Sequence, residues 1–210
     1  MKIYLELLEN GKPSKRDEYL QTLKHETDRL HQLIEDVLEF SQLNLTTEST
    51  RRELIDLNHL LEGRLTTWER LSTEQELAFQ LDLQPSLPLI QTDSQLVIQA
   101  LTRLISNAVN YTTAGSVTVS TAYRNQDDRR WVTISVRDTG PGIAAAELPH
   151  IFERFYRGRA AANYKIPGTG IGLTIAQEIV TRLKGHLTVE SQLGIGSTFT
   201  LWLPADTTGR

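Results

Sequence analysis

The sequence predicts an α+β fold, in which a two-layer sandwich of helices over one mixed sheet follows a helical hairpin that forms a dimeric four-helix bundle. Three observations predict it. An apolar repeat in steps of three and four runs through residues 20–41, a polar segment follows at 44–51, and strand-like and helix-like stretches then alternate along the chain. At 210 residues the chain is long enough for one good-sized domain and a smaller one.

The first 45 residues have the pattern of a helical hairpin. A coiled-coil seam of apolar or small residues is formed by Leu20, Leu23, Thr27, Leu30, Ile34, Val37 and Ser41. The stripe is widened by Leu33, Leu38 and Phe40, which favours a bundle of several helices. A shorter arm at residues 3–8 precedes it and ends at Asn10-Gly11. Because this short arm leaves much of the stripe uncovered, we expect an upstream continuation and a homodimer through residues 1–45.

Residues 46–52 are predicted to be a linker, residues 53–206 a second domain, and residues 207–210 a tail. The linker is polar and without periodicity, whereas strand and helix signals alternate after it. The predicted strands are 53–57, 76–83, 87–91, 116–123, 131–137, 186–191 and 197–203, and the predicted helices are 58–72, 93–111 and 170–183. The hairpin formed by 116–123 and 131–137 favours an α+β sandwich.

The composition excludes several classes of function. With 26 acidic and 22 basic residues the formal net charge is -4, so no global field attracts nucleic acid, and any phosphate binding must be local. The absence of Cys excludes disulfides and Cys-based zinc sites, and it favours a reducing compartment such as the cytoplasm. No segment reaches the roughly 18 apolar residues of a membrane span, so we expect a soluble fragment that contacts membranes only through segments outside this chain.

Two glycine-bearing segments are candidates for ligand binding. The first, residues 138–143 (DTGPGI), follows a predicted strand, and the Asp138 carboxylate could accept a hydrogen bond from an exocyclic amine such as that of adenine. An ordinary turn is the alternative. The second, residues 168–173 (GTGIGL), opens a predicted helix, where freed backbone N–H groups suit phosphates. A flexible hinge is the alternative there.

A polar ridge and a long loop add further candidates. Arg103, Asn107 and Tyr111 are spaced one helical turn apart on helix 93–111, and Asn107 is either a Mg²⁺ ligand or a solvated side chain. Loop 144–167 is long enough for a lid whose cations suit phosphates, or carries ordinary solvated charges. The chain contains no P-loop, dinucleotide-binding or protein-kinase signature.

The order and spacing of these segments resemble those of one protein family. The N, G1, F and G2 boxes and the closing strand of the histidine-kinase catalytic domain are matched by LTRLISNAVNYT, DTGPGI, IFERFYRG, GTGIGLTIA and GSTFTLWLP. This resemblance covers about residues 50–205. Residues 1–45 resemble the dimerisation and phosphotransfer hairpin, with ETDRLHQLIEDVLEFSQL matching its second helix. The chain thus resembles the ATP-binding catalytic region of a sensor histidine kinase of a two-component system.

The resemblance implies a role for each matching residue. Asp138 is expected to bind the adenine amino group of ATP or ADP, Asn107 to bind the Mg²⁺ that bridges the phosphates, and Tyr111 to stack near the adenine. Arg154 and Arg157 are expected to act with Asn107 in catalysis by neutralising phosphate charge. The other expected nucleotide contacts are Asn110, Gly140, Gly142, Ile143, Phe152, Phe155, Gly168, Thr169, Gly170, Ile171, Gly172 and Leu173. Two positions depart from the commonest pattern: Arg103 stands where Asn is frequent, and Asn110 where Lys or His is frequent.

The implied reaction transfers the γ-phosphoryl group of Mg-ATP to a histidine and then to an aspartate of a response-regulator receiver domain. We expect that histidine upstream of Met1. His25-Glu26 imitates the start of the family's H box, but the Arg-Thr-Pro that should follow is replaced by residues 27–30, TDRL. The chain alone is therefore expected not to autophosphorylate. The alternatives are a superfamily ATPase, which would need a catalytic carboxylate early in helix 93–111, and a non-catalytic ATP-binding or dimerisation module.

Overall fold

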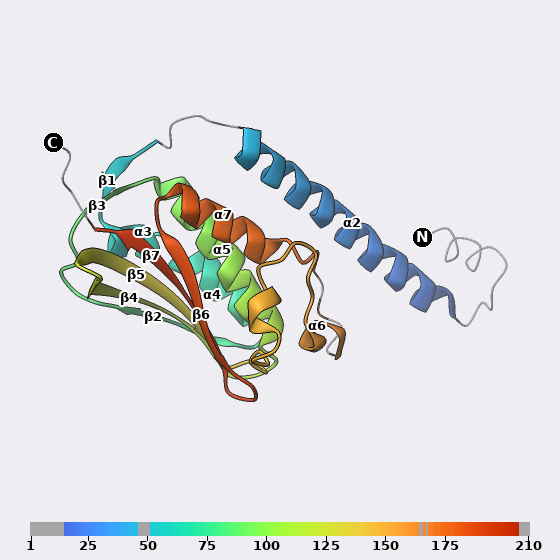
Figure 1. The fold of residues 1–210 in the computed structure, drawn as a ribbon. Helices are drawn as coiled ribbons and strands as arrows, with labels where there is room; N and C mark the ends of the chain where they lie inside the picture. Colours follow the sequence, from blue (N-terminus) through green and yellow to red (C-terminus); the bar gives the residue numbers. More distant parts are fainter. Residues whose placement is uncertain (1–14, 46–50, 164–165, 167, 206–210) are drawn as a thin grey trace.

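One layer of the fold is a five-stranded mixed sheet (Figure 1). The computed structural model describes residues 15–45, 51–163, 166 and 168–205. Within these residues β2 and β4 are parallel and the other neighbours are antiparallel, which confirms the predicted mixed sheet. The strands, in their order across the sheet, are β2 (Ala78–Leu83), β4 (Ser116–Gln126), β5 (Arg129–Asp138), β7 (Gly196–Pro204) and β6 (His186–Gln192).

The β4–β5 hairpin is longer than predicted. Its strands remain paired as far as Gln126 and Arg129, so only Asp127 and Asp128 form the turn. Both turn residues have positive φ, 51° and 57°, as the turn types that match strand twist require. The strand ends next to this turn are polar and show no apolar alternation. The sequence therefore predicted both strands to be shorter than they are.

Helices cover one face of this sheet and form the second layer (Figure 1). The core between the layers is fully buried and includes Leu57, Leu101, Ile134, Ile175 and Leu201. The predicted helix 58–72 is in fact two helices, because the chain turns at residues 63 and 64. The helices of this layer are α3 (Leu57–Glu62), α4 (Leu65–Thr73), α5 (Ser94–Tyr111) and α7 (Gly172–Arg182).

The long helix α2 (Arg16–Leu45) confirms the predicted second arm of the hairpin. The predicted first arm, residues 3–8, lies outside the described residues. Five large apolar side chains of α2 are 44% to 57% exposed: Leu20, Leu30, Ile34, Val37 and Leu38. A 30-residue helix therefore carries an apolar stripe that its own chain does not cover in the part of the chain the structure describes. No helix among the described residues is both long and apolar enough to cross a membrane.

The segment after α2 is fixed to the sandwich from residue 51 onwards. The backbone N–H of Arg51 donates to Oδ2 of Asp93 at 3.0 Å, while Oδ1 of Asp93 caps α5 by accepting from the N–H groups of Gln95 and Leu96. Strand β1 (Glu53–Ile55) then pairs antiparallel with β3 (Ile90–Thr92), which leads directly into α5. Residues 46–50, the larger part of the predicted linker, lie outside the described residues.

Candidate functional site

The carboxylate of Asp138 lies at the end of β5 with only 6% of the residue exposed. Its Oδ1 accepts two backbone hydrogen bonds, from the N–H of Gly140 at 2.9 Å and from the N–H of Ser197 at 3.2 Å. Within the described residues no protein donor reaches Oδ2. The turn at residues 138–140 thus fixes the orientation of the carboxylate and leaves one of its oxygens as an acceptor for a ligand.

Burial raises the pKa of Asp138 above the ordinary value of a carboxyl group, and the backbone hydrogen bonds from Gly140 and Ser197 oppose that rise. The charged form of this carboxyl group is therefore poorly solvated. A ligand that donates a hydrogen bond to it would restore part of the lost solvation. An amino group on a flat heterocycle has the required donor.

A small cavity adjoins this carboxylate, and we call it the Asp138 pocket. Its volume is about 80 Å³, and its walls include the apolar side chains of Ile143, Leu173 and Phe199 together with the ring of Tyr111. Burial raises the pKa of the Tyr111 hydroxyl; the nearby Glu147 raises it as well, and Arg157 lowers it. A narrow apolar slot with one oriented acceptor suits a planar base.

The glycines of segment 138–143 are required by packing. Gly142 has a φ of +67°, and a Cβ atom on it would lie 2.1 Å from the carbonyl oxygen of Gln192. A Cβ atom on Gly140 would lie 3.0 Å from Oδ1 of Asp138. Both glycines therefore let the segment pack closely against its own carboxylate and against the β6–β7 turn, and of the two only Gly142 borders the pocket.

A larger groove of about 700 Å³, here called the α2 groove, opens between α2, α5 and the glycine segment 168–173. Asn107 and Asn110 border it from α5. The glycine segment contributes Gly168, Thr169, Gly170, Gly172 and Leu173. Helix α7 begins at Gly172, and its first turn carries backbone N–H groups without partners inside the helix, which is the usual setting for a bound anion.

Six residues border both the Asp138 pocket and the α2 groove, so the two cavities adjoin. They are Asn107, Tyr111, Ile151, Tyr156, Arg157 and Leu173. Asn107 borders this junction from α5, and Arg157 borders it from the loop that follows β5. A ligand with a flat base and a charged tail could therefore occupy the pocket with its base and extend into the groove with its tail.

The predicted lid residues lie in the loop between β5 and α7, and they differ in whether they border the two cavities. Arg157 faces the site and also donates to the carbonyl oxygen of Ile166, whereas Arg154 borders neither cavity. Phe155 is 59% exposed, and its N–H donates to the carbonyl oxygen of Gly170 at 2.9 Å. Phe152 packs on the core, and its carbonyl oxygen accepts from Thr174. The loop contains the short helices η2 (Leu148–His150) and α6 (Arg159–Asn163).

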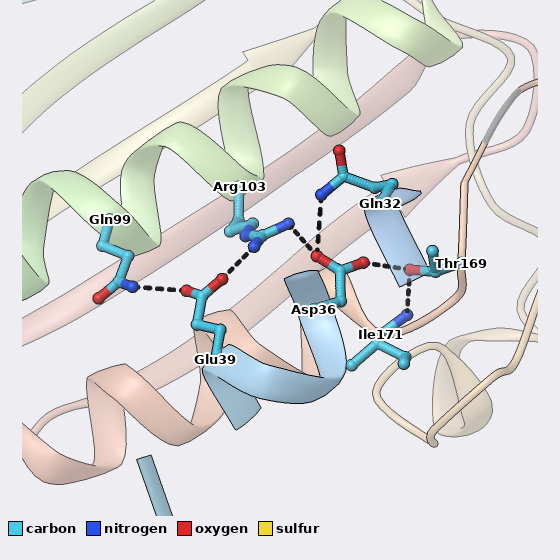
Figure 2. A network of polar contacts seen from close by, with 7 residues as sticks. All are labelled: Gln32, Asp36, Glu39, Gln99, Arg103, Thr169 and Ile171. Atoms are coloured by element: carbon cyan, nitrogen blue, oxygen red, sulfur yellow. Dashed lines mark hydrogen bonds and ion pairs between the residues drawn. The ribbon is translucent and has the colours of Figure 1, made fainter. Parts of the chain in front are cut away.

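One wall of the α2 groove is a network of polar contacts from α2 that the sequence interpretation missed (Figure 2). Oδ1 of Asp36 accepts from the guanidinium of Arg103 at 2.5 Å and from Gln32 at 3.1 Å, and Oδ2 accepts from the hydroxyl of Thr169. Glu39 pairs with the other arm of Arg103 and accepts from Gln99 at 2.5 Å. We call these six residues the Asp36 network.

Each charge in the Asp36 network is held by a partner. Asp36 is only 1% exposed, and its carboxylate is compensated by three donors. Burial lowers the pKa of Arg103, but Asp36 and Glu39 outweigh that effect and raise it overall. Arg103 is the one residue whose position in the sequence could have indicated its pairing with Asp36 and Glu39, because a largely buried cation needs a carboxylate nearby.

Of the predicted site residues, Ile171 is buried and borders neither cavity, although its N–H donates to Thr169 at 3.3 Å. Glu147 and Ser197 are among the residues of the Asp138 pocket that were not predicted. Ser197 acts through its backbone N–H, which no side-chain pattern reveals.

Two family models match the chain. The model described as "Histidine kinase-, DNA gyrase B-, and HSP90-like ATPase" matches residues 92–207, and the model described as "His Kinase A (phospho-acceptor) domain" matches residues 1–46. Both cavities are lined mainly by residues of the first match, whereas Gln32, Asp36 and Glu39 belong to the second.

The curated proteins similar to this chain include sensor histidine kinases. Drug sensory protein A of Synechocystis sp. is 34% identical over 191 residues, covering 88% of this chain and 28% of that protein. Sensor histidine kinase RppB of the same organism is 37% identical over 185 residues, covering 88% of this chain and 40% of that protein. The chain therefore spans 28% and 40% of the lengths of these two relatives.

Solved structures agree with this relationship. Full-length ShkA in complex with AMPPNP is similar with a TM-score of 0.73 and 29% identity, and the match covers 94% of this chain and 41% of ShkA. The family models, the relatives and the fold all lead to the same group. The chain belongs to the two-component sensor histidine kinases and contains their ATPase-type domain preceded by a region of the phospho-acceptor type.

Proposed function

We propose that this chain is the ATP-binding catalytic region of a sensor histidine kinase, which transfers the γ-phosphoryl group of ATP to a histidine. The observation that carries the proposal is the junction at Asn107, where a pocket with one oriented acceptor adjoins a groove with a glycine-rich helix start. We assign the adenine to the Asp138 pocket and the triphosphate to the α2 groove. ShkA, which was solved with AMPPNP, has the same fold.

Each part of the site has a distinct task in this proposal. Asp138 accepts a hydrogen bond from the adenine amino group through Oδ2, and Tyr111 stacks near the base. Backbone N–H groups of segment 168–173 bind the phosphates, and Arg157 adds a positive charge where the two cavities meet. The chain itself contributes positioning and charge, which is what phosphoryl transfer chiefly requires.

Asn107 is the proposed protein ligand of Mg²⁺. Its side chain reaches both cavities, and an amide oxygen is a ligand of the type that Mg²⁺ accepts together with phosphates and water. The ion would bridge the phosphates and offset their charge. Asn107→Ala is expected to raise the Mg²⁺ concentration needed for ATP binding by about tenfold. The matched control is Asn125→Ala, which removes an exposed amide from β4. If Asn107→Ala is as stable as this control and its Mg²⁺ titration is unchanged from wild type, the role of Asn107 is refuted.

We further propose that residues 53–206 fold as the ATP-binding domain and that residues 1–45 form a homodimer. Leu57 and Leu101 share one buried core, which supports the domain boundary. The exposed stripe of α2, which includes Ile34 and Leu38, supports the dimer. Light scattering should give twice the monomer mass for the full chain; a monomer at high concentration would contradict the dimer.

The phosphate acceptor is proposed to be a histidine outside this chain, and the onward acceptor an aspartate of a response-regulator receiver domain. His25 and His31 lie inside the continuous helix α2, whereas His59, His150 and His186 lie in or beside elements of the sandwich. An ATPase function is not favoured, because the only acidic residue at the start of α5 is Asp93, whose two oxygens cap the helix and bind Arg51.

Labelling with radioactive ATP tests this proposal. The chain alone should acquire no acid-labile, base-stable label, whereas a supplied helical hairpin that carries the family's H box should become labelled. Release of free phosphate without any labelled histidine would instead support an ATPase. Nucleotide binding with neither outcome would support a non-catalytic module, and label on His25 would show that the acceptor assignment is wrong.

A further inference from the structure

The Asp36 carboxylate is bound in the way that a phosphate oxygen is usually bound. A guanidinium, an amide N–H and a hydroxyl converge on it from three different segments of the chain (Figure 2). Arginine and hydroxyl donors are also the groups that proteins use for phosphates, because the charge and the donor geometry are alike. Asp36 therefore occupies donors that a terminal phosphate could use.

Two of these donors belong to the parts of the site that face the phosphates. Thr169 lies between the glycines of segment 168–173, and its hydroxyl also accepts from the N–H of Ile171 at the start of α7. Arg103 lies one helical turn before Asn107 on α5. Both residues border the α2 groove, as Asp36 does. The contact thus joins α2 to the phosphate end of the site.

The charge balance of this contact opposes an incoming phosphate. Asp36 and Glu39 together carry two negative charges against the single positive charge of Arg103. These groups are largely screened from solvent, so a phosphate placed beside them would meet a repulsion that water weakens only in part. The effect is largest for the γ-phosphate, which carries the most charge and extends furthest from the base.

We propose that Asp36 competes with the γ-phosphate of ATP for Thr169 and Arg103, and so determines the affinity of the site for ATP relative to ADP. This inference rests on the proposed function, because it assigns the α2 groove to the phosphates. Binding of ATP separates Asp36 from Thr169, whereas binding of ADP leaves the contact in place. By thermodynamic reciprocity, the α2 contact weakens ATP binding by the same factor by which ATP weakens the contact.

Nucleotide affinities of the full chain test the proposal. Asp36→Asn keeps the shape of the side chain and removes its charge, so ATP should bind about tenfold more tightly relative to ADP than it does in wild type, within the usual range of such couplings. Glu39→Gln retains Asp36 and removes one charge, so it should change the ratio in the same direction but less. The matched control is Glu35→Gln, a neighbouring exposed residue that pairs with His31 and should leave the ratio unchanged.

A second measurement does not depend on any substitution. Amide hydrogen exchange at residues 32–39 of the wild-type chain should rise with saturating Mg-ATP and should not rise with Mg-ADP. Equal ATP-to-ADP ratios in wild type and Asp36→Asn, or equal exchange with the two nucleotides, would refute the role of Asp36. Absence of binding of both nucleotides to wild type and to all variants would refute the proposed function itself.

Discussion

The Asp138 pocket and the α2 groove differ in which parts of the fold hold their decisive contacts. In the pocket, Asp138 is oriented by Gly140, two residues away, and by the neighbouring strand β7. In the groove, Asp36 contacts Arg103 across 67 residues and Thr169 across 133. The first site is built into the sheet, whereas the second exists only while α2 rests against the sandwich.

This difference suggests that the two halves respond differently to a change in the position of α2. The proposed acceptor for the base, Asp138, stays in place because backbone hydrogen bonds hold it. In our proposal, the donors for the phosphates change partners when Asp36 moves. Binding of the base and binding of the terminal phosphate should therefore be separable by mutation, and the following predictions test that separation.

The largest expected effect is the loss of adenine nucleotide affinity in Asp138→Asn. The N–H groups of Gly140 and Ser197 point at Oδ1, so the amide must place its oxygen there and its NH₂ group where Oδ2 was. That NH₂ group then faces the adenine amino group, donor against donor. ATP and ADP should both bind roughly ten- to hundredfold more weakly, as expected for a lost hydrogen bond to a charged group.

Calorimetry with ATP and ADP measures this loss. The matched control is Asp82→Asn, which removes one exposed carboxylate from β2 and should leave both affinities unchanged. Unchanged nucleotide affinity in a folded Asp138→Asn protein would disprove the assignment of the base to this pocket. A loss confined to ATP would contradict the separation of the two cavities.

Gly142→Ala should destabilise the fold by about 2 kcal/mol, because an alanine at positive φ is strained and its Cβ atom would overlap the Gln192 carbonyl. The melting temperature should fall by about 4–8 °C for a chain of this length. Gly172→Ala is the contrast, since no atom lies within 4 Å of its added Cβ and the residue is helical. Equal melting temperatures for the two variants would show that the turn at Gly142 is not packed as described.

The smallest expected effect is the pH dependence that Asp138 adds to stability. Its pKa in the folded chain is raised above 3.8, so the folded state binds more protons than the unfolded state in the window just above that value. The contribution to stability is therefore complete below pH 3.8 and is lost as pH rises through the folded pKa. Relative to wild type, Asp138→Asn should gain stability as pH increases across this window and then stay level. Denaturant unfolding at several pH values measures the difference, and a relative gain towards low pH would have the wrong sign.

Much of the sandwich could be predicted from the sequence, because its signals are local. Apolar alternation located the strands that contain Val119 and Ile134, and the turn at Asp138 was recognisable from six consecutive residues. The break at Gly63 was missed, since the apolar spacing of Leu57, Leu61 and Trp68 continues across it. The turn at residues 127 and 128 was likewise hidden by polar strand ends.

The groove could be predicted only in part. The glycine segment and Asn107 were identified from their own neighbours, but Asp36 looks like any acidic residue on a solvated helix face. Its role depends on how α2 packs against α5, and no periodicity within α2 encodes that packing. Arg103 was noted as a departure from the family pattern, and the structure gives the physical reason: it pairs with Asp36 and Glu39.

The contacts of Asp93 determine where a force on the segment between α2 and the sandwich would act. Its two carboxylate oxygens hold the first turn of α5 and the backbone of Arg51, and a second contact joins Ser94 to Glu53. A force that pulls on the chain after α2 is therefore applied first to the start of α5. Residue 51 cannot leave the sandwich without breaking its hydrogen bond to the same carboxylate that caps the helix carrying Asn107.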